Sequence, residues 1–594
     1  MTSEESIPTP DDITKIIQTG EAGVTDTDIA KLTQTQNPAT DKMIQADDTG
    51  ISAYADPENW ESIPCVFKLL FSDFIVEELE NGEVVTLWPL EKEELQEVPG
   101  EGEKSAEKSP PADILPLPKG FCEENVTLAM SLPKGETLLI DTTPLDKEER
   151  TAIHKYIRDL NPNLNSKTEG DSIVISVASR ADRKRRAWPE GQPDYLYFTL
   201  SKEFKDTSYC IRELSFKSGL NMKAFSFCGT KDRRGVTSQR VSCYRVPKEK
   251  MANIAEAIKN TRIHNFSYRQ KQLDMGCNEG NRFSIILRDV PKELGMEAVA
   301  KRIEGIGKYG FLNYFGHQRF GTLGVNTAEI GRLLLNENFQ EALDKIILTK
   351  LTNSTNDFKA ALESYEADKD AKKAYNMLGA NSKFKSIEGQ LLNGLLKYNG
   401  NAKEALLQSL QRESLSLYIH AFQSYIWNHV VSERINKYGP IILPGDFDEN
   451  GKVLEEGSTI FDIAIPLVSI EMDLPENETK EMIVRHMERF GVSKESFRPL
   501  LKRCMVSKTF RKMFKKATSQ IKCELINYEE ERQLLQRELL ADAIQKEGTT
   551  FTGLKVQFSL GSGDYATMLL REFLRFNVDK ESQKALGNVV GDRA

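Results

Sequence analysis

Short segments rich in β-branched and aromatic residues recur through the first half of the chain and constrain its fold more than any other feature. The segments are SIVISVAS, DYLYFTLSK, RVSCYRV and RFSIILRDV, at residues 172–179, 194–202, 240–246 and 282–290. Such residues with period-two alternation predict strands, whereas residues 295–309 and 326–346 have helical periodicity. We therefore expect strands and helices to alternate in this part of the chain.

The second half has a different pattern, which is mostly helical from residue 330 to 540. The clearest helix covers residues 414–437, where Leu415, Ile419 and Phe422 recur on one face. Turn and strand patterns interrupt the helices at 443–470. The last segment, 554–575, predicts a strand, a Gly-Ser-Gly-Asp loop and an amphipathic helix. A chain of 594 residues is long enough for about two to four domains.

Acidic residues are concentrated near the N-terminus. Residues 1–60 hold twelve Asp or Glu and three Lys or Arg, so they carry most of the net charge of −10. We expect a disordered acidic tail there, ordered structure from near Val66, and a flexible insertion at 80–112. The remaining chain is mildly basic, which permits a polyanionic partner such as RNA. No apolar run has the length of a membrane span, so we expect no membrane partner.

Cysteines and histidines are scattered along the chain. The eight cysteines are at least fifteen positions apart, and the six histidines form no HxH or HxxxH pair. This spacing excludes CxxC metal sites and favours free thiols in a reducing compartment. We therefore expect no metal site.

A short charged segment, FCGTKDRRGVTSQR at 227–240, places Asp232 among three basic residues between Gly229 and Gly235. The glycines fit a tight loop between two strands, and a solvated hairpin turn is the simplest interpretation. The spacing differs from that of a phosphate-binding loop, in which a carboxylate would repel phosphate. In the third interpretation Asp232 is catalytic, because nearby cations favour an ionised carboxylate and could also bind an RNA backbone.

A second segment, GFLNYFGHQRFG at 310–321, combines aromatic residues with three glycines, Asn313 and Arg319. Aromatic residues usually belong to a core, but this glycine density is unusual for a core element. A ring can stack on an extruded base, while an amide contacts a base edge or holds the loop. Basic runs at 180–188 and 498–516 are either solvated surfaces or phosphate contacts, and the first could also be a nuclear-import sequence.

These segments resemble the signatures of the TruD family of RNA pseudouridine synthases, in particular its eukaryotic branch. The first signature is similar to FSFCGTKDRRGVTSQRVSCYRV (225–246), with Gly235 where the family usually has alanine, and the second is similar to GFLNYFGHQRFG. Weaker matches follow the family order, at FKLLFSDFIVEEL (67–79), RRAWPEGQPDYLYFTLSKEFKDT (185–207), GNRFSIILR (280–288), HAFQSYIWNHVVSERI (420–435) and GSGDYATMLLREFL (561–574).

The resemblance implies an enzyme that isomerises uridine to pseudouridine in RNA without a cofactor. By the same resemblance, the essential aspartate is Asp232 and its partner lysine is Lys68. The aromatic residue that stacks on the target base is Phe315, accompanied by Asn313. We expect further substrate contacts from Arg319, Lys231 and Arg233, although the two loop residues could instead tune Asp232 or face solvent. The alternative function is a catalytically silent RNA-binding or RNA-folding protein on the same fold.

The resemblance also implies a domain arrangement. The fold class would be α+β, with a pseudouridine-synthase catalytic domain comprising residues 61–330 and 545–594. This domain would contain a mixed, largely antiparallel sheet flanked by helices. An α+β TRUD insertion domain would occupy 331–544, with RNA in a basic cleft between the domains. The implied substrates are tRNA, at the position-13 type of site, small nuclear RNA and messenger RNA. We expect a monomer in the nucleus, or in both nucleus and cytoplasm.

Overall fold

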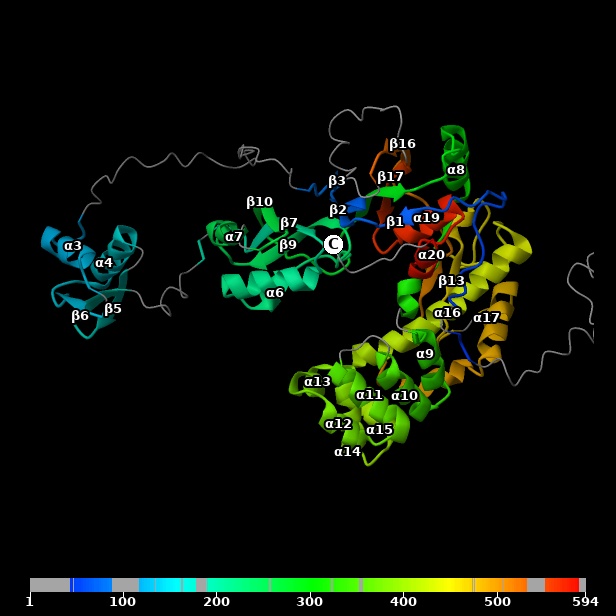
Figure 1. The fold of residues 1–594 in the computed structure, drawn as a ribbon. Helices are drawn as coiled ribbons and strands as arrows, with labels where there is room; N and C mark the ends of the chain where they lie inside the picture. Colours follow the sequence, from blue (N-terminus) through cyan, green and yellow to red (C-terminus); the bar gives the residue numbers. More distant parts are fainter. Residues whose placement is uncertain are drawn as a thin grey trace, which may run out of the picture.

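The computed structural model describes residues 43–586, apart from gaps at 46–47, 88–116, 178–187 and 531–550 and shorter gaps of one to four residues. Most of the expected acidic tail, most of the expected insertion and the basic run that begins at Arg180 therefore lie outside the described residues. Figure 1 shows a central sheet, a group of helices on one side of it and a small separate unit.

The central sheet contains strands from both ends of the described chain. Its order is β10, β7, β9, β2, β11, β17, β16, which span Thr261–Arg269, Tyr195–Glu203, Val236–Tyr244, Phe74–Glu80, Gly280–Arg288, Phe551–Gly561 and Lys522–Tyr528. The short strands β1 (Val66–Phe67), β3 (Glu83–Val84) and β8 (Phe225–Ser226) pair with β11, β2 and β9. Among the described pairs of this sheet only β2 and β9 are parallel. The expected mixed, largely antiparallel sheet is confirmed.

The C-terminal strand lies inside this sheet, as its sequence pattern predicted. β17 pairs with β11, so that Phe558 lies opposite Phe283 and the two rings stack at a centroid distance of 5.5 Å. β16 pairs with the other side of β17, so the sheet resumes at Lys522 and not at the expected residue 545. The amphipathic helix α19 (Ala566–Leu574) follows, and α20 (Lys580–Ala585) ends the described chain.

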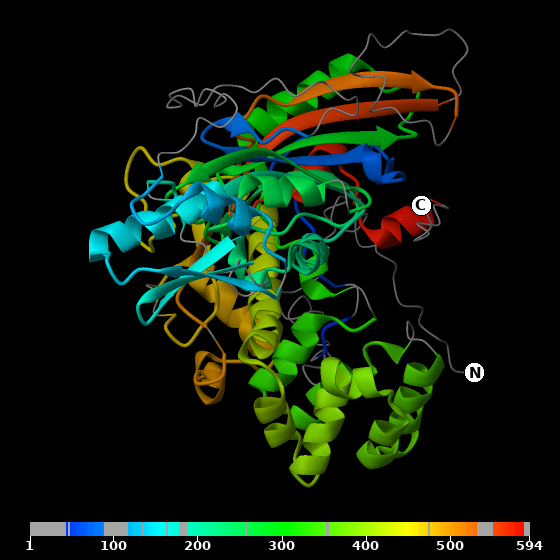
Figure 2. The same cartoon turned by 90° about the vertical axis from the view of Figure 1, so that its left-hand side faces the viewer.

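Helices occupy most of the chain between the two halves of the sheet (Figure 2). They are α8 (Met296–Tyr309), which confirms the helix expected at 295–309, α9 (Thr327–Leu335), α10 (Phe339–Leu348), α11 (Asn356–Asp368), α12 (Ala371–Met377), α13 (Ala380–Lys385), α14 (Ile387–Lys397), α15 (Ala402–Ser409), α16 (Arg412–Tyr438) and α17 (Glu478–Arg489). The helix expected at 326–346 is two helices, because Glu337 adopts a φ of 56° that a helix cannot continue through. Strand β13 (Ala464–Pro466) pairs with β14 (Phe510–Lys512), and β12 (Phe311–Leu312) pairs with β15 (Phe514–Lys515).

The segment that precedes the first strand is part of the core. Ile44 and Ala53 are buried, and the hydroxyl of Tyr425 on α16 donates to Asp48 at 2.6 Å. The backbone N–H of Ala55 donates to the Glu572 carboxylate on α19 at 2.9 Å. The expectation of a disordered tail up to residue 60 is therefore wrong for its last part, because these apolar side chains and buried backbone groups are held by the helices.

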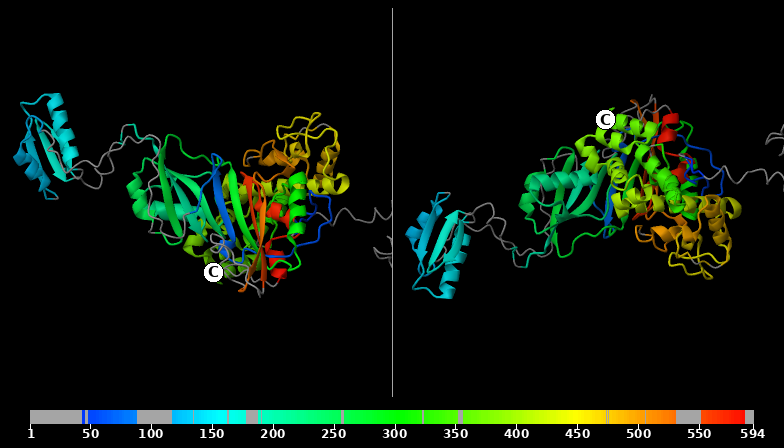
Figure 3. Two further views of the ribbon diagram at one scale, coloured as in Figure 1. Left: turned by 90° about the horizontal axis from the view of Figure 1, so that it is seen from above. Right: turned by 90° about the horizontal axis from the view of Figure 1, so that it is seen from below.

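Residues 117–177 form a small unit that the sequence did not separate from the catalytic domain. Strands β4 (Thr137–Asp141), β6 (Ser172–Val177) and β5 (Leu164–Glu169) pair in that order, with helices α3 (Glu123–Met130) and α4 (Lys147–Leu160) beside them. The unit has a core of its own, which includes Ile153, Ile173 and Ile175. Figure 3 shows it apart from the central sheet, so the strand expected at 172–179 is not a strand of that sheet.

Candidate active site

The loop that carries Asp232 joins β8 to β9 and lies against β2. A Cβ atom added to Gly235 would meet the carbonyl oxygen of Phe74 at 2.7 Å, which is closer than real Cβ atoms approach. Only a residue without a side chain therefore lets the loop approach β2 this closely. This contact gives a physical reason for glycine at a position where the family usually has alanine.

Buried side chains hold the loop backbone from below. The N–H of Lys231 donates to the Thr207 hydroxyl at 3.1 Å, and that hydroxyl donates to the Gln239 amide oxygen at 2.9 Å. The ammonium of Lys202 donates to the carbonyl oxygens of Lys231 and Asp232, at 3.2 and 2.8 Å. Burial lowers the pKa of Lys202 to about 8. These hydrogen bonds hold the loop by its main chain.

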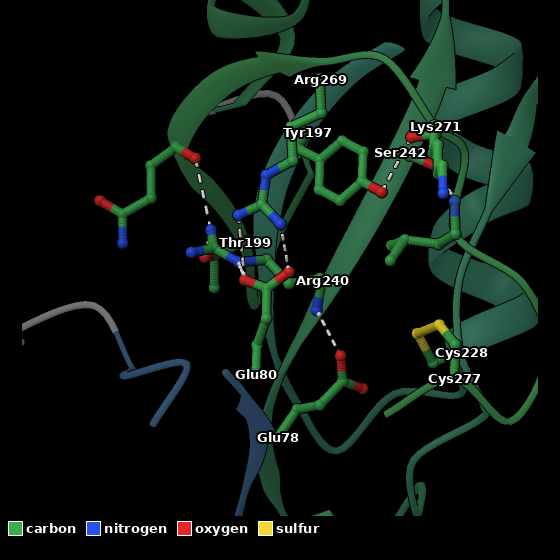
Figure 4. A network of polar contacts seen from close by, with 12 residues as sticks. Glu78, Glu80, Tyr197, Thr199, Cys228, Arg240, Ser242, Arg269, Lys271 and Cys277 are labelled. Atoms are coloured by element: carbon green, nitrogen blue, oxygen red, sulfur yellow. Dashed lines mark hydrogen bonds and ion pairs between the residues drawn. A yellow bond between two sulfur atoms is a disulfide. The ribbon is translucent and has the colours of Figure 1, made fainter. Parts of the chain in front are cut away.

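Lys231 points into the protein and not towards solvent. Its ammonium lies 2.8 Å from the Glu78 carboxylate, and the two side chains are 6% and 2% exposed. Glu78 also accepts the backbone N–H of Arg240 at 3.2 Å (Figure 4). This burial differs from the expectation that Lys231 contacts substrate, because an RNA phosphate cannot reach an ammonium enclosed with its own counter-ion. Lys231 instead fixes the loop to β2.

Asp232 has the opposite environment, since its side chain is 44% exposed. The Lys68 ammonium lies 2.9 Å from its Oδ2, so the structure brings together the two residues that the resemblance paired. Lys68 adopts a φ of 55°, and its ammonium lies 3.5 Å from the centroid of the Phe74 ring. Burial lowers the pKa of Lys68, while the Asp232 charge opposes that shift. A half-exposed carboxylate beside a buried cation can act as a nucleophile or base toward a ligand that approaches from solvent.

The two arginines of the loop diverge. Arg233 is exposed, with its guanidinium 5.1 Å from the Phe204 ring centroid. Arg234 turns inward and donates to the Leu69 carbonyl at 3.4 Å. Of the loop cations, Arg233 is therefore the one whose position allows the predicted substrate contact.

The second predicted segment forms a separate cluster around Asn313, which is 2% exposed. Its amide donates to the Lys512 carbonyl at 2.9 Å, and its backbone N–H donates to the Met513 carbonyl at 2.9 Å. Both of its oxygens accept hydrogen bonds from Arg511, at 3.0 and 2.6 Å. The sequence left two roles open for this amide. The geometry supports holding the loop, because the amide is buried and both its nitrogen and its oxygen already bond to protein groups.

Phe315 lies beside Asn313 and is 7% exposed. Its backbone N–H donates to Asn428 on α16 at 3.0 Å, and its ring meets the edge of Trp427 at a centroid distance of 5.5 Å. The guanidinium of Arg511 covers the ring at 4.1 Å, and that of Arg319 lies 5.8 Å away. A base that stacks on Phe315 must therefore displace Arg511 or use the remaining part of the ring.

Arg511 is the functional candidate that sequence reasoning missed. It was one of eight basic residues in the run 498–516, and nothing in that run distinguished it. Burial lowers the pKa of Arg511 to about 10, and no carboxylate among the described residues forms an ion pair with it. The run does not form one phosphate-binding face, because Lys515 pairs with Asp564 at 2.9 Å and Arg498 pairs with Glu495 at 2.7 Å.

Helix α20 connects the two clusters. The Gln583 side chain accepts the backbone N–H of Phe67, which directly precedes Lys68, at 2.9 Å. It also donates to the Cys65 carbonyl at 3.1 Å. Asp579, the N-cap of the same helix, lies 3.4 Å from His317 in the second segment. The last described helix therefore contacts both the strand that leads to Lys68 and the segment that contains Phe315.

One disulfide lies directly before the loop that carries Asp232. Cys228 is bonded to Cys277 (Figure 4). The carbonyl of Cys228 also accepts the N–H of Gly276 at 2.6 Å. The expectation of free thiols is therefore wrong for these two residues, which are distant in sequence but adjacent in the fold. The other six cysteines are free thiols, as expected.

Metal-binding clusters and membrane-spanning helices are both absent from the described residues. No group of three or more His, Cys, Asp or Glu in this part of the chain is placed to hold a metal ion. Within the same residues, no helix has both the length and the apolar character that crossing a bilayer requires.

Comparison with known proteins gives consistent matches. The family model for tRNA pseudouridine synthase D (TruD) matches residues 167–573. A Caenorhabditis elegans protein named as a pseudouridine synthase is 31% identical over 547 residues, covering 90% of this chain and 93% of that protein. The multisubstrate pseudouridine synthase 7 of Schizosaccharomyces pombe is 29% identical, covering 91% of each chain. A Methanosarcina mazei crystal structure described as TruD has a similar fold, with a TM-score of 0.54, 19% identity and coverage of 89% and 97%.

Proposed function

The chain belongs to the TruD family of RNA pseudouridine synthases, and we propose that it acts on tRNA at the position-13 type of site, with small nuclear RNA and messenger RNA as further substrates. As a member of this family it is an isomerase that converts uridine to pseudouridine. The choice of RNA is supported by the family description, which names tRNA, and by a multisubstrate relative.

The observation that carries the catalytic assignment is the Lys68–Asp232 ion pair at 2.9 Å on a rigidly held loop. In the reaction the N1–C1′ bond breaks, a C5–C1′ bond forms, C5 loses a proton and N1 gains one, so no redox step occurs. We assign to Asp232 either attack on C1′ or removal of the C2′ proton, both of which need an ionised carboxylate. Lys68 favours that form by its charge.

Base extrusion is the second requirement, because C1′ and C5 of a stacked uridine are inaccessible to a carboxylate. Phe315 is our candidate for the ring that supports the extruded base. Its ring packs against Trp427, its backbone N–H donates to Asn428, and Arg511 occupies the space next to the ring. Replacement of the Arg511 guanidinium by uracil would exchange one planar stacking partner for another, and Arg319 would remain beside the ring.

Location and assembly are further proposals. We assign the protein to the nucleus, or to both nucleus and cytoplasm, on the basis of the basic run that begins at Arg180. We also propose that it acts as a monomer, since both site clusters are built from one chain.

Pseudouridine mapping in unmodified transcripts tests the proposed substrate. Purified protein should convert the position-13-type uridine of a tRNA transcript without an added cofactor, and it should also modify small nuclear and messenger RNA. RNA binding without conversion in any of the three classes would favour the alternative of a silent RNA-binding protein. Conversion that spares tRNA would overturn the tRNA assignment alone.

A further inference from the structure

One face of helix α6 (Thr207–Ser218) carries the exposed side chains of Tyr209, Arg212 and Phe216, and the half-buried Lys205 precedes the helix on the same side. Lys205, Tyr209, Arg212 and Phe216 follow at intervals of four, three and four residues, which places them along one side of the helix and its entry. We name these four residues the α6 stripe. The opposite side of α6 packs into the core beneath the sheet through Cys210, Ile211 and Leu214.

The aromatic members of the stripe are unusually open to solvent. Phe216 is 84% exposed and Tyr209 is 39% exposed. A solvent-exposed phenylalanine contributes nothing to the core. A large apolar side chain on a surface commonly marks a contact site when charged or polar groups that could bind a partner surround it. Here the surrounding side chains are mainly cationic, since Lys205, Arg212, Lys217 and Lys223 outnumber Asp206 and Glu213.

The basic members of the stripe lie beside the aromatic rings. The Lys205 ammonium is 5.2 Å from the Tyr209 ring centroid, and the Arg212 guanidinium is 5.7 Å from the same centroid. Neither side chain forms an ion pair with a carboxylate in the part of the chain that the structure describes. Exposed Lys217 and Lys223 add positive charge near the far end of the helix. The face therefore offers rings for stacking and cations for an anionic partner.

The stripe begins at the catalytic loop. The N–H of Phe204 donates to the Gly235 carbonyl at 3.1 Å, and Arg233 covers the Phe204 ring at 5.1 Å. Thr207, the first residue of α6, accepts the N–H of Lys231. From Thr207 to Phe216 the helix rises about 14 Å, at 1.5 Å per residue. Figure 1 shows α6 beside β7 and β9.

From these observations we infer that the α6 stripe is a docking surface for unpaired nucleotides of the RNA substrate. Bases stack on Tyr209 and Phe216, and phosphates contact Lys205 and Arg212. Alternating rings and cations are how proteins bind single-stranded nucleic acid without reading its sequence. A protein partner would need an acidic apolar surface, and the enzyme's RNA substrate already supplies the required anion. The inference depends on the proposed function only in that an RNA is the ligand.

Substitutions of Phe216 separate stacking from other contacts, because this side chain is too exposed for its loss to unfold the protein. The full-length enzyme is titrated with an unmodified tRNA transcript and, separately, with a 20-nucleotide oligouridylate. Phe216→Ala should raise the Kd for both RNAs about 5- to 100-fold, the equivalent of one lost stacked base. Phe216→Trp should bind like wild type, whereas Phe216→Leu should lose as much affinity as the alanine variant. The kcat at saturating RNA should stay unchanged.

Arg212 gives a second, electrostatic test. Arg212→Gln should weaken binding to every RNA and reduce the slope of log K against log salt by about one. The matched control is Phe384→Ala, since Phe384 on α13 is 76% exposed but lies outside the stripe. A Kd within twofold of wild type for Phe216→Ala would overturn the inference. Equal losses in Phe384→Ala, or full affinity in Phe216→Leu, would also overturn it.

The oligouridylate titration separates this inference from the proposed function. Wild-type enzyme that modifies no tRNA but binds oligouridylate through Phe216 would refute the tRNA assignment and support the stripe. If wild-type enzyme modifies tRNA while the Phe216 variants bind RNA normally, the tRNA assignment is supported and the α6 stripe is refuted as a docking surface.

Discussion

Removal of the Lys231 ammonium tests whether this residue holds the catalytic loop from inside or contacts RNA. Its Nζ lies 2.8 Å from Glu78, and both side chains are buried. In Lys231→Met the Glu78 carboxylate would keep its burial and lose its counter-ion. Breaking a buried pair in this way costs about 3–5 kcal/mol. Because each 1.4 kcal/mol is a factor of ten, the population of the open loop should rise about 100- to 3,000-fold.

Hydrogen–deuterium exchange of the full-length protein measures that opening directly. The peptide that covers residues 227–240 contains the Lys231 amide, which is protected by its hydrogen bond to Thr207. Exchange in this peptide should accelerate in proportion to the open population, while peptides from α16 should be unchanged. The kcat should fall because the loop that carries Asp232 becomes less ordered. The Kd for RNA should stay within about threefold of wild type, since exposed charges elsewhere supply the phosphate contacts.

A double variant distinguishes an uncompensated charge from simple loss of packing. Lys231→Met with Glu78→Gln removes both charges and keeps an acceptor for the backbone N–H of Arg240. Most of the lost protection should return in this variant. If Lys231→Met instead exchanges like wild type and binds RNA tenfold more weakly, then Lys231 is a substrate contact and does not hold the loop.

Three further perturbations test other parts of the site. Arg511→Lys should lower kcat/KM about 10- to 100-fold, because lysine lacks the planar fork that bonds both oxygens of Asn313 and so orders the segment that carries Phe315. Steady-state rates that match wild type would contradict this. Gly235→Ala should destabilise the loop by about 1–3 kcal/mol through the clash with the Phe74 carbonyl, and hydrogen exchange in the 227–240 peptide should be faster. Unchanged exchange would show that β2 shifts to accommodate the added methyl group. Above pH 8 the folded protein loses the Lys202 proton, while the unfolded chain keeps it up to its ordinary pKa of 10.5, so Lys202 should make stability rise with pH. Activity should fall over the same range, because a neutral amine forms weaker hydrogen bonds to the loop carbonyls than an ammonium does. Lys202→Met should remove both trends in pH-dependent unfolding and rate profiles, and profiles parallel to wild type would refute the assignment.

Local patterns predicted the parts of the fold that depend on neighbouring residues. The alternating segments at β7, β9 and β11 are strands, and the periodic segment at 414–437 lies within α16. The strand after residue 550 lies in the central sheet, as its β-type pattern and the family resemblance indicated. These features follow from side-chain periodicity, which a single sequence contains in full.

Long-range contacts explain what the sequence could not supply. The order of the segment before residue 60 depends on α16 and α19, and the disulfide joins Cys228 to a residue forty-nine positions away. Motif matching located Lys68 and Asp232 and found the cations around Asp232. It could not show that Lys231 is enclosed with Glu78 or that Arg511 covers Phe315, because both partners come from other elements. Burial decides the role of each cation, and burial is a property of the whole fold.

The central claim is that the Asp232 carboxylate performs the isomerisation. Formation of pseudouridine releases the hydrogen on C5, so tRNA that contains uridine tritiated at C5 reports each turnover as tritium in water. Wild-type enzyme in excess over tRNA should release tritium in a single turnover without added cofactor. Asp232→Asn should release none while binding the same tRNA within about threefold of wild type, since the substitution removes one charge from a half-exposed side chain. Tritium release by the asparagine variant at a rate near that of wild type would contradict the account.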